Sequence, residues 1–136
     1  MKKVNLLGVP LDLGAENLGV DIGPNAFRYQ KIIEKLHHAG LDVMDKGDIT
    51  PHARNTLEIG DTKLKYLDEI LRVSEIAAEK TYEIVKKDGR ILALGGDHSI
   101  NLGTISGVSA ALEGDLGLIY FDTHGDLNTH ETTLTG

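Results

Sequence analysis

Three side chains that could bind a divalent metal ion alternate along one short segment of this chain. Asp122, His124 and Asp126 are separated by single uncharged residues and come directly after the apolar run Leu116–Phe121. Such a run predicts a buried strand, and in an extended backbone the side chains at i, i+2 and i+4 point to the same side. We therefore expect the three side chains to converge beyond a strand end, where carboxylates and an imidazole suit manganese, iron or zinc. A polar loop whose aspartates bind turn backbone is the alternative for this segment alone.

A second segment of the same kind lies earlier in the chain. The apolar run Arg90–Leu94 predicts another strand, and two glycines followed by Asp97 and His98 come after it. Paired glycines let the backbone turn sharply and bring the next side chains close to a ligand. Because ligands bind beyond the carboxyl ends of strands in open parallel sheets, His98 is a fourth candidate metal ligand. Asp97 is interpreted instead as a residue that supports the ligands or as a residue of the turn.

The elements that must position these segments alternate between strand and helix. The apolar pattern predicts strands over 4–9, 41–48, 90–94 and 116–121 and helices over 24–39, 62–87 and 101–112. This alternation predicts a three-layer α/β fold, in which helices flank both faces of a parallel sheet. One stripe of the long helix is expected to face the core, and it comprises Leu64, Leu67, Leu71, Ala78, Thr81 and Val85. No linker or repeat divides the chain.

The composition excludes several classes of protein. The 136 residues include no cysteine, so the chain has neither a disulfide framework nor a thiolate zinc site. The formal net charge of −7 disfavours nucleic acid and anionic membranes as partners, because both need clustered positive charge. A cationic substrate such as a guanidinium compound would be attracted. Neither a signal sequence nor a membrane-spanning stretch is recognised, so we expect a cytoplasmic protein.

The segments that carry the candidate ligands resemble the arginase (ureohydrolase) family. The resemblance rests on Gly95-Gly96-Asp97-His98-Ser99, on Asp122-Thr123-His124-Gly125-Asp126-Leu127-Asn128-Thr129 and, near the N-terminus, on Gly8–Gly14, Gly19–Pro24 and Arg28. These segments occur in the family's order, so the resemblance covers the whole chain and implies the N-terminal portion of a bacterial-type arginase. Residues 1–136 would then be part of a single arginase-like α/β domain. Thr123, where the family usually has alanine, is a departure at a position that binds no metal.

The family's site holds two Mn²⁺ ions, so the resemblance implies a role for each candidate ligand. Asp122 is implied to bridge the two ions, and His124 to bind one of them. His98 and Asp126 are implied to complete the coordination of the other ion, and Asp126 also to orient the attacking hydroxide. The implied reaction is hydrolysis of the guanidinium group of L-arginine to ornithine and urea. Family members are commonly trimers or hexamers, so a homo-oligomer is expected.

The residues after the second ligand segment point to the substrate. Asn128, Thr133 and Thr135 belong to a tail rich in neutral hydrogen-bond donors, which can bind a carboxylate without repelling a guanidinium group. By resemblance, these residues sit where arginases contact the α-carboxylate of arginine, which agmatine lacks. Arginine is therefore the expected substrate. A solvated loop of small polar residues is the alternative interpretation.

Other parts of the family's site are expected beyond the end of this chain. Two dications carry four positive charges, whereas Asp122 and Asp126 supply two negative charges, and a dinuclear site needs more ligands than these segments offer. The resemblance places a further Asp-x-Asp pair and a proton-transfer histidine, within an Asn-x-His-Gly segment, beyond Gly136. Residues 1–136 alone are therefore expected to be inactive. The alternatives are an agmatinase-like ureohydrolase or, if the chain is naturally complete, a non-catalytic half-site metal-binding module.

Overall fold

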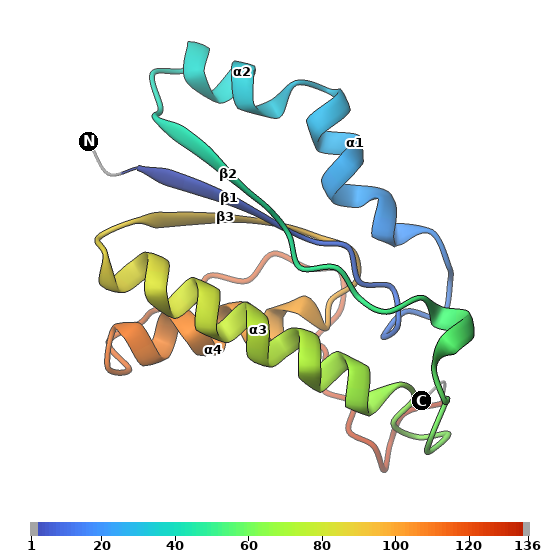
Figure 1. The fold of residues 1–136 in the computed structure, drawn as a ribbon. Coiled ribbons are helices and arrows are strands. Elements are labelled where there is room, and N and C mark those ends of the chain that lie inside the picture. Colours follow the sequence, from blue (N-terminus) through green and yellow to red (C-terminus); the bar gives the residue numbers. More distant parts are fainter. Residues whose placement is uncertain (1–2, 135–136) are drawn as a thin grey trace.

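The central layer is a parallel sheet of three strands in the order β2-β1-β3 (Figure 1). In the computed structural model, which describes residues 3–134, β1 spans Val4–Val9, β2 spans Val43–Asp48 and β3 spans Arg90–Gly95. β1 pairs in parallel with both neighbours, and all six of its residues are buried. Strands buried in this way need cover on both faces of the sheet.

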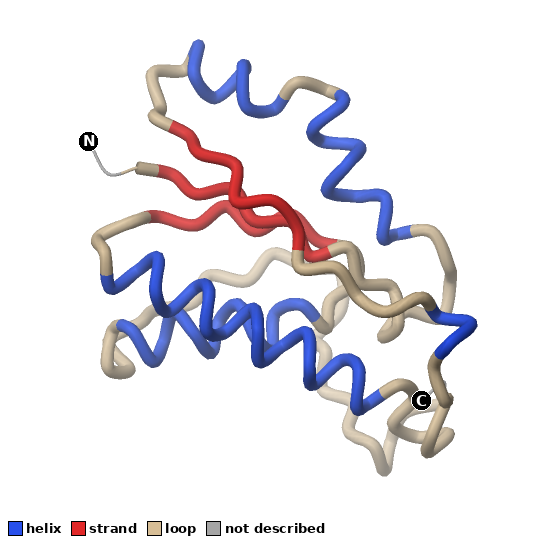
Figure 2. The backbone as a smooth tube through the Cα atoms, viewed as in Figure 1, coloured by secondary structure: helices blue, strands red, loops and turns tan. Residues whose placement is uncertain are grey.

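Within residues 3–134, four α-helices provide that cover, as Figure 2 shows. α1 (Gly23–Tyr29) and α2 (Ile32–His38) lie on one face, and α3 (Leu67–Lys86) and α4 (Ile100–Ala111) lie on the other. This arrangement confirms the predicted three-layer α/β fold with a parallel sheet. None of the helices in the described part of the chain is long and apolar enough to cross a membrane.

Alternation along β1 divides the core into two clusters. Leu6 and Leu94 belong to the cluster that lies against α2. Leu7 and Val9 belong to the cluster on the opposite face, together with Val73 of α3. Because successive side chains of a strand point to opposite faces, β1 holds both helical layers at once. The loops that leave its carboxyl end therefore start from a firmly packed position.

Two helix boundaries differ from the prediction. The expected helix over 24–39 is divided into α1 and α2 by Lys31, whose φ of 57° lies in the left-handed region. α3 begins at Leu67 rather than near residue 62, directly after Tyr66 with a φ of 55°. Glycine is the residue that usually marks a left-handed position. Since neither residue is glycine, the sequence carries no local signal for these breaks.

The predicted stripe of α3 is only partly confirmed: Thr81 is buried, Ala78 and Val85 are half-buried, and Leu64 lies before the helix. Leu67 and Leu71 are 38% and 41% exposed, and the buried face of α3 is rotated away from them. It comprises Glu69, Val73, Ser74, Ala77 and Thr81. α4 is the cause, because a Cβ at its Gly103 or Gly107 would collide with backbone oxygens of α3. α3 divides its buried face between the sheet and this closely packed helix.

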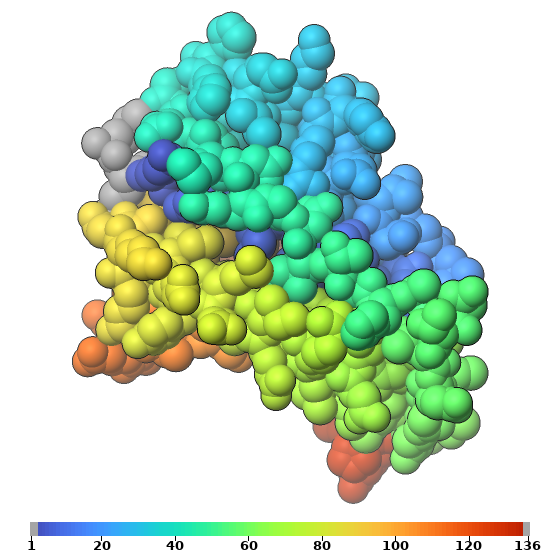
Figure 3. Space-filling view, in the orientation of Figure 1, coloured from blue at the N-terminus to red at the C-terminus, as the bar shows by residue number. Residues whose placement is uncertain are grey.

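The predicted strand over 116–121 is not a strand in the structure. Residues 115–122 have no regular secondary structure, and Ile119 and Phe121 are 82% and 94% exposed. The last described residues, red in Figure 3, project from the lower edge of the molecule. An apolar run becomes a strand only where a neighbour satisfies its backbone hydrogen bonds. Within residues 3–134 this run has no such neighbour.

Candidate metal centre

His98 lies on a turn that packs against the loop after β1. The amide of Gly96 donates a hydrogen bond to the carbonyl of Val9 (3.3 Å), and the amide of Asp97 donates to that of Leu11 (2.8 Å). Gly96 approaches so closely that a Cβ there would collide with the Leu11 carbonyl oxygen. His98 is thereby anchored to the buried part of the molecule.

The side chain of Asp97 stabilises this turn through hydrogen bonds to backbone amides, as expected for a residue of the turn. Its carboxylate accepts hydrogen bonds from the amides of Gly14 (2.8 Å) and Ser99 (2.9 Å). The N-terminal glycine pattern meets the same turn at a second point, since a Cβ on Gly23 would collide with the carbonyl oxygen of Gly95. These contacts explain why glycines far apart in the sequence are required around one turn.

Three of the four predicted metal ligands lie together. His98, Asp122 and Asp126 each offer one ligand atom within 4.8 Å of the others. The Nδ1 atom of His98 is 3.4 Å from the Oδ2 atom of each aspartate. All three residues are exposed. One imidazole nitrogen and two carboxylate oxygens form a donor set that suits a divalent cation.

His124 is not a member of this group among the described residues. Its side chain is 78% exposed, and its Nδ1 atom lies 3.4 Å from Oδ1 of Asp122, the oxygen other than the one nearest His98. The extended backbone predicted for 122–126 is wrong, because Asp126 has a φ of 46°. A turn, and not strand alternation, therefore brings Asp126 to Asp122 and leaves His124 on the far side of Asp122.

Sequence reasoning missed Tyr120. Its hydroxyl contacts Nε2 of His98 (2.8 Å), Oδ2 of Asp122 (3.3 Å) and the carboxylate of Asp126. The hydrogen bond to Asp126 raises the pKa of Tyr120, whereas the backbone amide of His124 lowers the pKa of Asp122. The two-residue spacing between Tyr120 and Asp122 is visible in the sequence, but the contact of Tyr120 with His98 depends on the fold.

The predicted carboxylate-binding residues lie in a tail that is partly held by its own hydrogen bonds. Oδ1 of Asn128 accepts a hydrogen bond from the hydroxyl of Thr132 (3.3 Å), and Thr135 lies outside the described residues. The ammonium group of Lys63, from the loop before α3, donates to the carbonyl of Thr133 (2.6 Å). A positive charge therefore reaches the segment in which the sequence predicted neutral donors.

Comparison with known proteins identifies the family. The arginase family model matches residues 2–136. The chain is 42% identical over 137 residues to arginase from Bacillus caldovelox, which covers 100% of this chain and 46% of that protein. It is 43% identical over 138 residues to arginase from Brevibacillus brevis, with 99% and 45% covered. The chain belongs to the arginase family.

Solved structures of arginases support this family assignment. The structure of arginase from Bacillus caldovelox matches with a TM-score of 0.90 and 41% identity, covering 99% of this chain and 45% of that one. Arginase from Bacillus cereus matches with a TM-score of 0.87 and 43% identity, covering 100% and 44%. The predicted resemblance to the arginase family is therefore confirmed. This arginase-family chain spans about half the length of the curated relatives that it matches.

Proposed function

We propose that the whole protein hydrolyses the guanidinium group of L-arginine to ornithine and urea, with two Mn²⁺ ions as its cofactor. The cluster of His98, Asp122 and Asp126 carries the proposal, in a chain that belongs to the arginase family. The relatives are named arginase, which supports hydrolysis of arginine at the level of the family. Because the chain spans about half of their length, the proposal concerns the whole protein and not residues 1–136 alone.

The charges of the cluster fit one divalent ion well and a second ion in part. Asp122 and Asp126 together balance the charge of one dication, and His98 adds a neutral nitrogen donor. Asp122 faces His98 with one carboxylate oxygen and His124 with the other. This orientation supports the proposal that Asp122 is shared between two ions and that His124 binds the second. We expect the remaining ligands, including an Asp-x-Asp pair, beyond Gly136.

The proposed chemistry assigns the chain's own residues to positioning and proton handling. When bound, the divalent ions make a water molecule nucleophilic near neutral pH. The carboxylate of Asp126 would accept a hydrogen bond from a water molecule at the site and orient it toward the guanidinium carbon. This carbon is a poor electrophile because three nitrogens share its positive charge, so correct positioning contributes much of the rate. The proton for the leaving amine comes from a histidine expected beyond Gly136.

The tail supplies the proposed preference for arginine over agmatine. Asn128, Thr133 and Thr135 are proposed to donate hydrogen bonds to the α-carboxylate. The ammonium group of Lys63, which lies against the Thr133 carbonyl, would attract the α-carboxylate of arginine and repel its guanidinium group. By family resemblance we further propose that the protein is cytoplasmic and forms a homo-oligomer, either a trimer or a hexamer. Light scattering of the whole protein tests this oligomeric state.

The first experiment measures urea release and bound manganese for Asp122→Ala in the whole protein. We expect kcat/KM for L-arginine to fall at least about 1,000-fold, because metal-ion catalysis contributes several kcal/mol to lowering the barrier. Bound manganese is expected to fall as well. Glu131→Ala is the matched control, since it removes an exposed carboxylate of the same segment and should leave both quantities unchanged.

The same assay separates the proposal from its alternatives. Undiminished urea release by Asp122→Ala would refute the assignment of the metal site. Faster urea release from agmatine than from arginine would favour an agmatinase-like enzyme. Metal binding with no urea release from either compound would favour a non-catalytic metal-binding module.

A further inference from the structure

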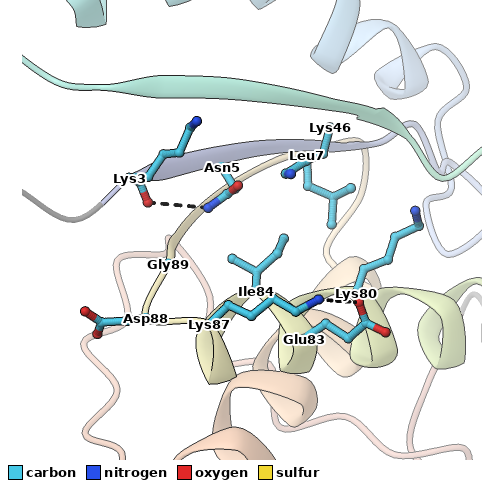
Figure 4. Close-up of a pocket in the computed structure, with 10 residues that line it drawn as sticks. All are labelled: Lys3, Asn5, Leu7, Lys46, Lys80, Glu83, Ile84, Lys87, Asp88 and Gly89. Atoms are coloured by element: carbon cyan, nitrogen blue, oxygen red, sulfur yellow. Dashed lines mark hydrogen bonds and ion pairs between the residues drawn. The ribbon is translucent and has the colours of Figure 1, made fainter.

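A cavity lies at the other end of the sheet from the candidate metal centre. It has a volume of about 520 Å³ and opens between the strands β1 and β2 and the last turns of α3 (Figure 4). Its lining comprises Lys3, Asn5, Leu7, Lys46, Lys80, Glu83, Ile84, Lys87, Asp88 and Gly89. None of these residues belongs to the candidate metal centre or to the exposed segment after α4.

The cavity lies at the margin of the sheet–helix interface, where buried residues of β1 meet exposed lysines. Asn5 lies two residues before Leu7 on β1, on the strand face that packs against α3. Lys80, Ile84 and Lys87 follow one another at helical spacing along the side of α3 that lines the cavity. Ile84 is half-buried, and Lys80 and Lys87 on either side of it are exposed. The margin of the interface therefore stays open.

The cavity gathers positive charge in a chain that is acidic as a whole. Four lysines line it, although the chain has 14 basic residues against 21 acidic ones. The acidic side chains of the lining are Glu83 and Asp88, and Glu83 pairs with Lys87 at 3.3 Å. Lysines therefore outnumber carboxylates two to one. A concave site lined by one sign of charge focuses the electrostatic potential and concentrates ligands of opposite charge.

The walls of the cavity are built from buried residues as well as from exposed lysine side chains. Asn5 is 7% exposed, and its amide donates hydrogen bonds to the carbonyls of Lys3 (3.4 Å) and Arg90 (3.2 Å). Gly89 makes this possible, since a Cβ there would lie 2.8 Å from the Asn5 amide nitrogen. Leu7, which is fully buried, and Ile84 contribute apolar surface.

We propose that this cavity binds a small polyanion whose phosphate or carboxylate groups pair with Lys46 and Lys80. Its volume lies within the range of small-molecule pockets, roughly 300–1,000 Å³, and it is concave, which favours a small ligand over an acidic protein surface. The site is separate from the proposed arginine site, because four ammonium groups repel a guanidinium ion. Its ligand is therefore a second molecule and not the substrate.

The test is calorimetric titration of the metal-loaded whole protein with pyrophosphate and, in parallel, with citrate. The variant Lys46→Gln/Lys80→Gln removes one lysine from each wall of the cavity. We expect it to weaken binding about tenfold or more, since each lost charge contact contributes a few-fold even in a high dielectric. Lys31→Gln/Lys35→Gln is the matched control, because it removes the same charge around α2. A preference for pyrophosphate over citrate would identify phosphate as the recognised group, and the reverse would identify carboxylate.

Pyrophosphate and citrate also bind metal ions, so Asp122→Asn is included to remove binding at the candidate metal centre. Binding that survives Asp122→Asn and weakens in Lys46→Gln/Lys80→Gln supports the proposal. Binding that vanishes in Asp122→Asn and is unchanged in the lysine variant overturns it, as does equal weakening in the control variant. Absence of binding of both anions to the unaltered protein also overturns it. Thermal melting of each variant, with urea release from arginine, shows whether the fold and the proposed function are retained independently.

Discussion

Two apolar runs of six residues have opposite surroundings in this molecule. Val4–Val9 forms β1 and is buried throughout, whereas Leu116–Phe121 is exposed and without regular structure. Both runs read as buried strands. β1 has a paired strand on each side and helices over both faces, and the second run has neither within the described residues. The difference shows that apolar composition makes a strand possible, while pairing and cover make it form.

The ligands of the candidate metal centre come from both kinds of surroundings. His98 belongs to a turn anchored by β1 and its following loop, whereas Asp122 and Asp126 belong to the exposed segment. The cluster therefore joins one well-supported ligand to two ligands with little packing around them. Substitutions in the packed part of the chain, residues 4–111, should therefore differ in effect from substitutions in the exposed segment, residues 115–134.

The largest effect is expected from a matched pair of truncations in the two apolar runs. In the 136-residue chain, Leu6→Ala should lower the free energy of unfolding by about 2–5 kcal/mol, because it leaves a cavity at a fully buried position. Phe121→Ala should change it by less than about 0.5 kcal/mol, because its side chain is 94% exposed. Urea denaturation of both variants measures the difference. A loss above 2 kcal/mol from Phe121→Ala would show that the exposed segment is packed in solution, and it would contradict the difference described between the two runs.

A buried carboxylate in the packed part should make stability depend on acid pH. Arg72 at 2.6 Å and the backbone amide of His52 at 2.7 Å lower the pKa of Glu69 from its ordinary value of 4.5 to about 2. These partners stabilise the charged form. Their contribution, up to about 3 kcal/mol, is therefore complete above pH 4.5 and is lost as the pH falls toward 2.

Unfolding measured between pH 2 and pH 7 tests this effect. Glu69→Gln should lower stability at pH 7 and flatten its decline below pH 4.5. Glu83→Gln, which changes an exposed carboxylate of the same helix, is the control and should preserve the acid decline. If the two variants have the same pH profile, the partners of Glu69 do not stabilise its charge.

Substituting one glycine in each part of the chain should show the same difference in backbone packing. Gly96→Ala places a Cβ against the Leu11 carbonyl oxygen and should cost about 1–3 kcal/mol through overpacking. It should also weaken manganese binding by the whole protein, because the same turn carries His98. Gly117→Ala meets no atom within 4 Å and should leave stability and metal binding nearly unchanged. Equal effects of the two substitutions would contradict the packing described for the turn.

The smallest effect is expected at a contact that joins the two parts. Lys63→Ala removes the ammonium group that lies against the Thr133 carbonyl. In the whole protein it should lower kcat/KM for L-arginine by about two- to fivefold, as expected for an exposed charge pair, and leave that for agmatine unchanged. Lys65→Ala changes a neighbouring lysine of the same loop and provides the comparison. An equal loss for both substrates would exclude a role of Lys63 in attracting the α-carboxylate.

Much of the packed part could be predicted because its signals are local. Val4–Val9 and Arg90–Gly95 are apolar runs that end at turns, and the structure has strands there. The two glycines before Asp97 predicted a sharp turn, and that turn presents His98. A pattern of neighbouring residues is sufficient for such features, because backbone sterics and alternation act over a few residues.

The buried face of α3 and the contacts of Tyr120 could not be predicted in this way. The buried face of α3 includes polar residues such as Glu69 and Ser74, and the close approach of α4 at Gly103 and Gly107 selects it. Tyr120 reaches His98 because its segment lies beside the turn after β3, and it reaches Asp126 because the chain turns back there. Both outcomes depend on distant segments, which no local periodicity describes.

The sequence by itself determined the family, the α/β alternation and the types of metal-binding side chain, because these depend on residue identity and short spacing. Only the tertiary structure decided which apolar runs are buried and which predicted ligands meet. It united His98 with Asp122 and Asp126, left His124 on the far side of Asp122, and opened a lysine-lined cavity beside β1. The physical reason is that burial and convergence require partners far away in the chain, and their positions are set by packing as a whole.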